Sequence, residues 1–151
     1  MTTKSFRGLL ADGAIQTIPL STNNGSTGYK IIKFEIMTNS ISAASVEHTI
    51  QIFKIPQAEG SATQVIDFSN PTLLAAAVTM SRVDAFNAPL TSEVIFDNEI
   101  FNQDIYVTHK DNQSSEACNY YIELEMVKLA LDENTVATLK DIRNIESAKN
   151  V

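Results

Sequence analysis

The chain has 151 residues, the size of one domain, and 44% of them are hydrophobic, which suffices for one core without disulfides or metal. The formal net charge is −7 and the eleven Lys and Arg residues are scattered, which argues against binding to nucleic acid or to an acidic membrane surface. The chain has a single cysteine, Cys118, so it has no internal disulfide, and we expect it to fold in a reducing cytoplasm.

Apolar and polar residues alternate in several stretches, which is the pattern of half-buried strands. The pattern predicts strands at 13–20, 29–37, 46–54, 92–97, 104–110 and 119–131, and a short strand at 63–68. Residues 70–80, NPTLLAAAVTM, are ambiguous. Asn70 and Pro71 suit the start of a helix, and the Leu-Leu-Ala-Ala-Ala run favours a helical turn or two; a buried strand is the alternative.

The arrangement of these elements indicates the fold class. No helical pattern between the strands is long or regular enough for parallel crossovers, so the strands are expected to pair antiparallel. The sequence therefore predicts an all-β fold, an antiparallel β-sandwich of the jelly-roll or Greek-key type, with a short C-terminal α-helix. No internal repeat or shift in composition divides the chain, so residues 1–151 are expected to form a single domain.

Two terminal segments are expected to extend from the sandwich. The C-terminal tail, about 132–147, begins at a suitable N-cap, Asp132, and carries an apolar residue at every third position, which predicts an amphipathic helix. A helix of this length is marginal alone in water, so its apolar stripe must lie on another surface. The N-terminal segment, about 1–12, is expected to be an arm. The predicted protein interface comprises Val136, Leu139, Ile142 and Ile145 of the tail, with Phe6, Leu9 and Leu10 of the arm.

The residues that carry chemistry are few. His48 and His109 share the parity of buried neighbours, so we interpret them as structural histidines, and Cys118 as a small packing residue. A zinc site or a Cys–His nucleophilic pair is the rival interpretation. Gly25 and Gly28 precede a strand and not a helix, which indicates turn chemistry and not a phosphate loop. The sequence thus predicts no catalytic residue, no metal and no cofactor.

Carboxylates and tyrosines leave two further alternatives. The acidic residues between 97 and 104 match no EF-hand spacing but are of the type that binds calcium. Tyr29, Tyr106 and Tyr121 are candidates for a sugar-stacking platform, with core or interface packing as the simpler interpretation.

Two stretches carry a resemblance: TIPLSTNNGSTGYKIIKFEIM (17–37), and 94–144, which contains VIFDNEIFNQDIYVTHKD and CNYYIELEMVKLALDENTVATLKDIRN. They resemble small virion structural proteins of marine tailed bacteriophages. The resemblance implies a non-enzymatic capsid decoration (cement) protein that is assembled into the virion in the host cytoplasm. Its partner would be the major capsid protein, with self-association as a homotrimer or other homo-oligomer. A tail or neck component, or a carbohydrate-binding module on a tail appendage, is the alternative.

Overall fold

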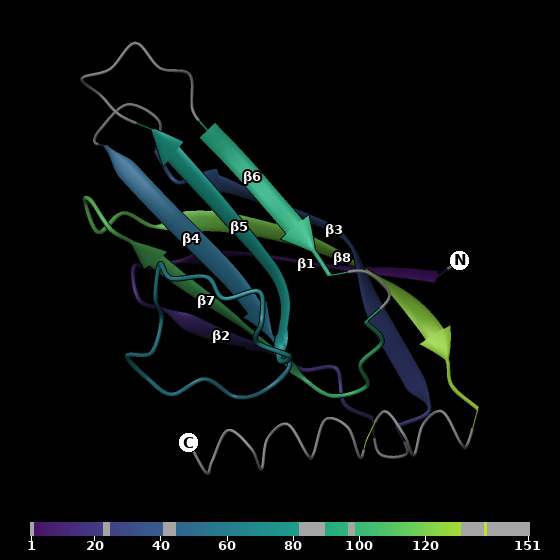
Figure 1. Ribbon diagram of the computed structural model, residues 1–151. Helices are drawn as coiled ribbons and strands as arrows, with labels where there is room; N and C mark the ends of the chain where they lie inside the picture. The colour runs from purple at the N-terminus through teal and green to yellow at the C-terminus, as the bar shows by residue number, and fades with distance from the viewer. Residues whose placement is uncertain are drawn as a thin grey trace.

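The computed structural model describes residues 2–22, 25–40, 45–81, 90–96, 99–130 and 138. Within these ranges the chain forms two antiparallel β-sheets that pack face to face, which confirms the predicted all-β sandwich (Figure 1). The strands are β1 (Thr2–Leu10), β2 (Ile15–Ile18), β3 (Thr27–Thr38), β4 (Val46–Phe53), β5 (Leu73–Ser81), β6 (Leu90–Ile95), β7 (Ile105–Asp111) and β8 (Cys118–Lys128). Among the described residues, no helix is long and apolar enough to cross a membrane.

The strand order resembles that of a jelly roll, with one departure at β6. One sheet has three strands in the order β1-β8-β3, and the other has five in the order β2-β7-β4-β5-β6. Three pairs of strands follow from this order: β1 with β8, β2 with β7, and β4 with β5. A chain that is doubled back at its middle and then wound into two sheets has these pairs. In this chain β6 bonds to β5 and forms the outer edge of the larger sheet.

The core lies between the sheets and is built from alternate residues of the central strands. Strand β8 contributes Ile122 and Leu124, and β7 contributes Ile105 and Val107, all of which are completely buried. The predicted alternation of β8 is correct, because its even-numbered residues face the core. In β3 a shift of register between Ile31 and Lys33 exposes residue 32, which the sequence pattern places inside.

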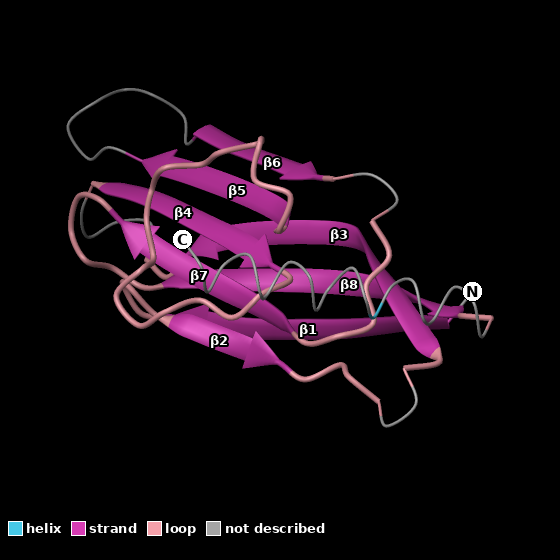
Figure 2. Ribbon diagram, turned by 60° about the horizontal axis from the view of Figure 1, so that its bottom comes forward, coloured by secondary structure: helices cyan, strands magenta, loops and turns pink. Residues whose placement is uncertain are grey.

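Two further predictions are corrected by the strands. Residues 73–81 form β5 and not a helix, because the run lies between β4 and β6 and is buried for most of its length. Tertiary packing thus overrides the helical propensity of its alanines. Residues 63–68 form no strand. They belong to the connection between β4 and β5, which crosses the outer face of the five-stranded sheet (Figure 2) and accepts two hydrogen bonds from the buried Gln51 side chain at Thr63 and Val65.

The N-terminal segment is also different from its prediction. Residues 2–10 are strand β1, which pairs with β8 along its whole length, so they belong to the sandwich and are not a free arm. The sequence signal for this strand is weak because its inward positions are Phe6, Gly8 and Leu10, and glycine contributes no side chain to the core. The remaining predicted tail, 132–147, lies outside the described residues except for Thr138.

Candidate functional site

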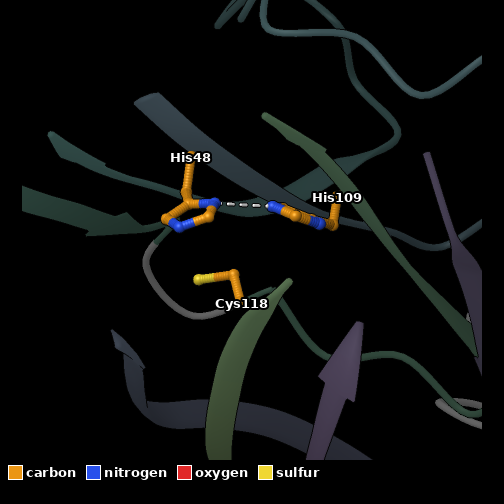
Figure 3. Close-up of side chains that lie close together, drawn as sticks. All are labelled: His48, His109 and Cys118. Atoms are coloured by element: carbon orange, nitrogen blue, oxygen red, sulfur yellow. Dashed lines mark hydrogen bonds between the residues drawn. The ribbon is translucent and has the colours of Figure 1, made fainter. Parts of the chain in front are cut away.

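Three metal-binding side chains meet at one end of the sandwich. His48 lies near the start of β4, His109 lies near the end of β7, and Cys118 is the first residue of β8. Their ligand atoms all lie within 4.8 Å of one another, and they form the one such group among the described residues. Figure 3 shows the three side chains close together, with a hydrogen bond between the two imidazole rings and Cys118 beside them. We refer to His48, His109 and Cys118 as the HHC cluster.

The topology brings these residues together. Strands β4 and β7 are antiparallel neighbours, so the start of one lies beside the end of the other. The two histidines therefore project from the five-stranded sheet toward the interior. Cys118 comes from the opposite, three-stranded sheet, where it pairs with Thr38 at the end of β3. The HHC cluster thus spans the space between the sheets.

Hydrogen bonds fix both imidazole rings. His48 Nδ1 lies 2.9 Å from His109 Nε2, and the rings are tilted by 44°. The outer nitrogen of each ring has its own partner: His48 Nε2 lies 2.9 Å from Thr38 Oγ1, and His109 Nδ1 lies 3.0 Å from the carbonyl oxygen of Ala11. The inner nitrogens of the two rings therefore face each other, close to the Cys118 sulfur.

The surroundings of the HHC cluster are closed to solvent but carry negative charge. His48 is 1% exposed, and His109 and Cys118 are completely buried. Burial, together with the neighbouring His109, lowers the pKa of His48, and the carboxylates of Asp111 and Asp12 act in the opposite direction. Burial tends to raise the pKa of Asp111, but hydrogen bonds from the backbone amides of Glu47, Glu116 and Gln113 outweigh it and lower that pKa. Asp111 is therefore an anion beside the cluster at neutral pH.

The sulfur of Cys118 is not arranged as a nucleophile. Burial raises the pKa of its thiol to about 12, so the sulfur is protonated at neutral pH when no cation is bound. The thiol donates a weak hydrogen bond to the carbonyl oxygen of Met37, 3.5 Å away, and it is not exposed to solvent. A reaction of the Cys–His type requires a substrate to reach the sulfur. The arrangement instead suits either internal packing or the binding of a cation.

A second feature lies at the surface of the three-stranded sheet. An open groove of about 770 Å³ follows three consecutive rows of paired residues across β1, β8 and β3 and extends to Thr91 and Glu93 of β6. The rows are Arg7–Tyr121–Glu35, Gly8–Tyr120–Ile36 and Leu9–Asn119–Met37. We refer to this as the sheet groove. Leu9 and Met37 stand at its two sides and are 54% and 69% exposed.

The predicted interface residues have different positions in the structure. Phe6 packs against the core, Leu10 is buried, and Leu9 alone of the three N-terminal residues is largely exposed. Val136, Leu139, Ile142 and Ile145 lie outside the described residues. Thr138, between them in sequence, accepts a hydrogen bond of 2.8 Å from the side chain of the buried Asn102. The tail therefore touches the sandwich at this point.

The three tyrosines proposed as a sugar platform do not lie together. Tyr29 is 2% exposed and stacks on Phe101 in the core. Tyr106 and Tyr121 alternate with core residues in strands of different sheets, so they face opposite sides of the sandwich. Asp104, a calcium candidate, accepts hydrogen bonds from the backbone amides of Leu20 and Ser21. Its carboxylate therefore has a structural role in joining two segments.

Neither comparison with known proteins identifies a relative: no protein-family model matches the chain, and no curated protein is significantly similar to it. The fold and its features therefore define the protein as an antiparallel β-sandwich with a closed HHC cluster and an open sheet groove.

Proposed function

We propose that this protein is a non-enzymatic structural component of a tailed-phage virion, and specifically a decoration protein that binds the assembled head. The resemblance of residues 17–37 and 94–144 to virion structural proteins of marine phages supports the proposal. The jelly-roll winding is also compatible with it, because many viral capsid domains and lectins have this architecture. That second argument is an analogy of fold, and a fold alone does not define a function.

The observation that carries the proposal is the sheet groove. Its two sides present the large apolar side chains of Leu9 and Met37, which are exposed to solvent. A partner that covered them would remove this apolar surface from water. Arg7, Glu35 and Glu93 surround them, so the groove combines apolar anchors with charges of both signs. This composition is typical of a protein–protein interface, which has an apolar centre and a polar rim.

The proposed occupant of the groove is a surface segment of the major capsid protein. The groove crosses every strand of a three-stranded sheet and is open along its length, which suits a stretch of polypeptide. In the described residues β1 pairs only with β8, so its outer edge is also available for an added strand. A homo-oligomer, such as a trimer, would present several grooves to the symmetric head, and repeated modest contacts then act together.

The size of each contact is modest. Full burial of a Leu or Met side chain contributes about 1.5–3 kcal/mol. Because Leu9 and Met37 are already partly covered, completing their burial would contribute about 2–4 kcal/mol together, or roughly 30-fold to 1,000-fold in affinity. Such a contribution is large enough to measure at one site.

The experiment uses particles of the encoding phage that were produced without this chain. Purified protein is added, particles are sedimented, and bound copies are counted by quantitative mass spectrometry. The double variant Leu9→Asp plus Met37→Asp should remain folded, because both side chains are exposed, and should bind at least about 30-fold more weakly. The matched control is Val65→Asp plus Phe68→Asp, which makes the same change of charge at exposed residues of the β4–β5 connection.

Three results would contradict the proposal. These are binding of the groove variant equal to that of wild type, an equal loss of binding by the control variant, and absence of the chain from purified virions. Antibody labelling of virions in negative-stain microscopy separates the head from the tail or neck. Label on the tail alone would replace the decoration role by the tail alternative.

A further inference from the structure

Each of the four ring nitrogens of His48 and His109 has a hydrogen-bonding partner, and these partners limit where the ring protons can lie. The carbonyl oxygen of Ala11 only accepts, so His109 Nδ1 carries a hydrogen. The hydroxyl of Thr38 has one hydrogen, and it has two acceptors within reach: the carbonyl oxygen of Ser40, 3.3 Å away, and His48 Nε2, 2.9 Å away. When Thr38 donates to Ser40, its Oγ1 accepts, and His48 Nε2 carries the hydrogen that it receives.

This assignment leaves the inner nitrogens without protons. A neutral imidazole has only one N–H group, and each ring has used it on its outer side. His48 Nδ1 and His109 Nε2 therefore present lone pairs to each other across 2.9 Å. Two lone pairs at this distance repel each other unless positive charge lies between them. A cation at the centre of the cluster would remove this repulsion, and the three buried ligand atoms within 4.8 Å of one another are the types that hold one.

We propose that His48, His109 and Cys118 bind one thiophilic metal ion of the Cu⁺/Zn²⁺ class through His48 Nδ1, His109 Nε2 and Cys118 Sγ. Imidazole and thiolate are the ligands that these ions prefer. The outer-side hydrogen bonds are those expected around metal-binding histidines, which typically donate their second N–H to an oxygen that fixes the ring.

The geometry requires the ligand atoms to shift on binding: the three now lie within 4.8 Å of one another, and an ion at their centre would draw the sulfur closer to the nitrogens. Zn–N bonds of about 2.0–2.1 Å at a tetrahedral angle separate two ligand nitrogens by about 3.3 Å. The observed separation is 2.9 Å, so the rings would move apart by a few tenths of an ångström. Binding also replaces the thiol proton of Cys118 with the metal–sulfur bond and releases that proton to solvent. The described residues supply three ligands, and a trigonal set of two histidines and one cysteine favours copper over four-coordinate zinc.

The position of the cluster predicts a structural effect of the ion. Two of its ligands belong to the five-stranded sheet and the third to the three-stranded sheet, so the ion would join the sheets. Because the cluster is closed to solvent, the ion is expected to enter during folding and not by diffusion into the native protein. A test must therefore supply the metal while the chain refolds.

In the test, the full chain is unfolded in denaturant and refolded with Zn²⁺, with Co²⁺ as a spectroscopic substitute for Zn²⁺, or with Cu⁺ kept reduced by ascorbate. Bound metal is measured by mass spectrometry after desalting. We expect one ion per chain, a thiolate-to-metal charge-transfer band with Co²⁺, and a Tm about 5–11 °C higher at a free metal concentration of 100 Kd. Binding of Cu⁺ alone or of Zn²⁺ alone identifies the ion, and either supports the site.

Substitutions test whether the ion is held by these residues. Cys118→Ala fills the same buried position with a smaller apolar side chain and should abolish stoichiometric binding and the charge-transfer band. Thr38→Val removes the oxygen that orients His48 and should weaken binding about 10-fold to 100-fold. Thr72→Val is the matched control, because it also removes a threonine hydroxyl that makes a side-chain hydrogen bond. Thr72 precedes β5, whereas His48 pairs with Thr79 near the end of that strand, so this variant should bind the ion as wild type does.

Two results would overturn the proposal. One is stoichiometric binding that persists in Cys118→Ala, since the ion would then lie elsewhere. The other is failure of the refolded wild type to bind any of these ions. In that case ¹⁵N spectroscopy of the imidazole rings should find a proton on His48 Nδ1 bonded to His109 Nε2. Thr38 would then donate to His48, and the cluster would be a hydrogen-bonded core element only.

Discussion

Asp104 offers a sharp test of how a single carboxylate joins two segments of the sandwich. It immediately precedes β7, and its Oδ1 atom accepts hydrogen bonds from the backbone amides of Leu20 and Ser21, at 2.8 and 2.9 Å. These residues follow β2, so the carboxylate fixes the chain where it leaves the β2–β7 pair. Burial tends to raise the pKa of Asp104, but hydrogen bonds from Ser21 and Leu20 outweigh it and lower that pKa.

The expected loss of stability on replacing Asp104 follows from its two hydrogen bonds. Hydrogen bonds to a charged group contribute about 1.5–3 kcal/mol each when buried, and less at a partly exposed position such as this one. Asp104→Ala should therefore lower the free energy of unfolding at pH 7 by about 2 kcal/mol, and Tm by about 4–8 °C. Asp104→Asn keeps an acceptor oxygen and loses only the charge, so it should cost about 1 kcal/mol.

The pH dependence distinguishes charge from shape. Because the folded-state pKa of Asp104 is depressed, the stabilisation from its charge is present above the ordinary value of 3.8 and is lost as the pH falls through the folded-state pKa. Thermal unfolding of wild type and Asp104→Asn, followed by circular dichroism from pH 7 to pH 2, should give a Tm difference of about 2–4 °C at pH 7 that vanishes at pH 2. A difference of the same size at both pH values would refute this reasoning.

Three other predictions concern packing, a buried ion pair and the tail. Gly8→Val should destabilise the fold by about 1–3 kcal/mol in urea denaturation, because a Cβ atom there would lie 2.9 Å from the ring of Tyr120; an equal stability would contradict the packing. Glu99→Gln leaves the 1%-exposed ammonium of Lys54 without its anionic partner and should cost about 3–5 kcal/mol, much of which Lys54→Met should restore in the double variant. Leu139→Asp plus Ile142→Asp should leave the sandwich folded and abolish sedimentation with particles; a variant that unfolds instead would assign the predicted helix to the protein's own core.

Sequence alternation predicted most strands of the sandwich. Strands β3, β4, β7 and β8 fall within two residues of their predicted start, since their apolar residues repeat with a period of two. Strand β5 was ambiguous because Ala75, Ala76 and Ala77 are all buried, so no alternation marks the strand. The sequence does not predict strand β1, because an edge strand needs few apolar residues. Its position is fixed by backbone pairing with β8 from Thr2 to Leu10.

The HHC cluster was partly predictable. The parity of His48 and His109 correctly indicated that both side chains face the interior. Their meeting with Cys118 depends on which strands are neighbours and on their register, and local sequence determines neither. One signal was present: a histidine near the start of one strand and another near the end of a second strand lie at the same end of the sheet if those strands pair antiparallel. The sheet groove has no such signal, because it combines residues of four strands.

The central place of β8 in the smaller sheet has a consequence for the order in which the protein is made. Strands β1 and β3 flank β8 and bond to it on either side, yet among the described strands β8 is the last to leave the ribosome. Until it emerges, the first and third strands of the nascent chain lack their common partner, so co-translational folding cannot complete this sheet. Pairing between residues as far apart as Thr2 and Met126 is slow, and the waiting strands are open to wrong partners. Chaperones that shield exposed strands should therefore raise the yield of this protein, and a chain terminated before Lys128 should accumulate as an insoluble product.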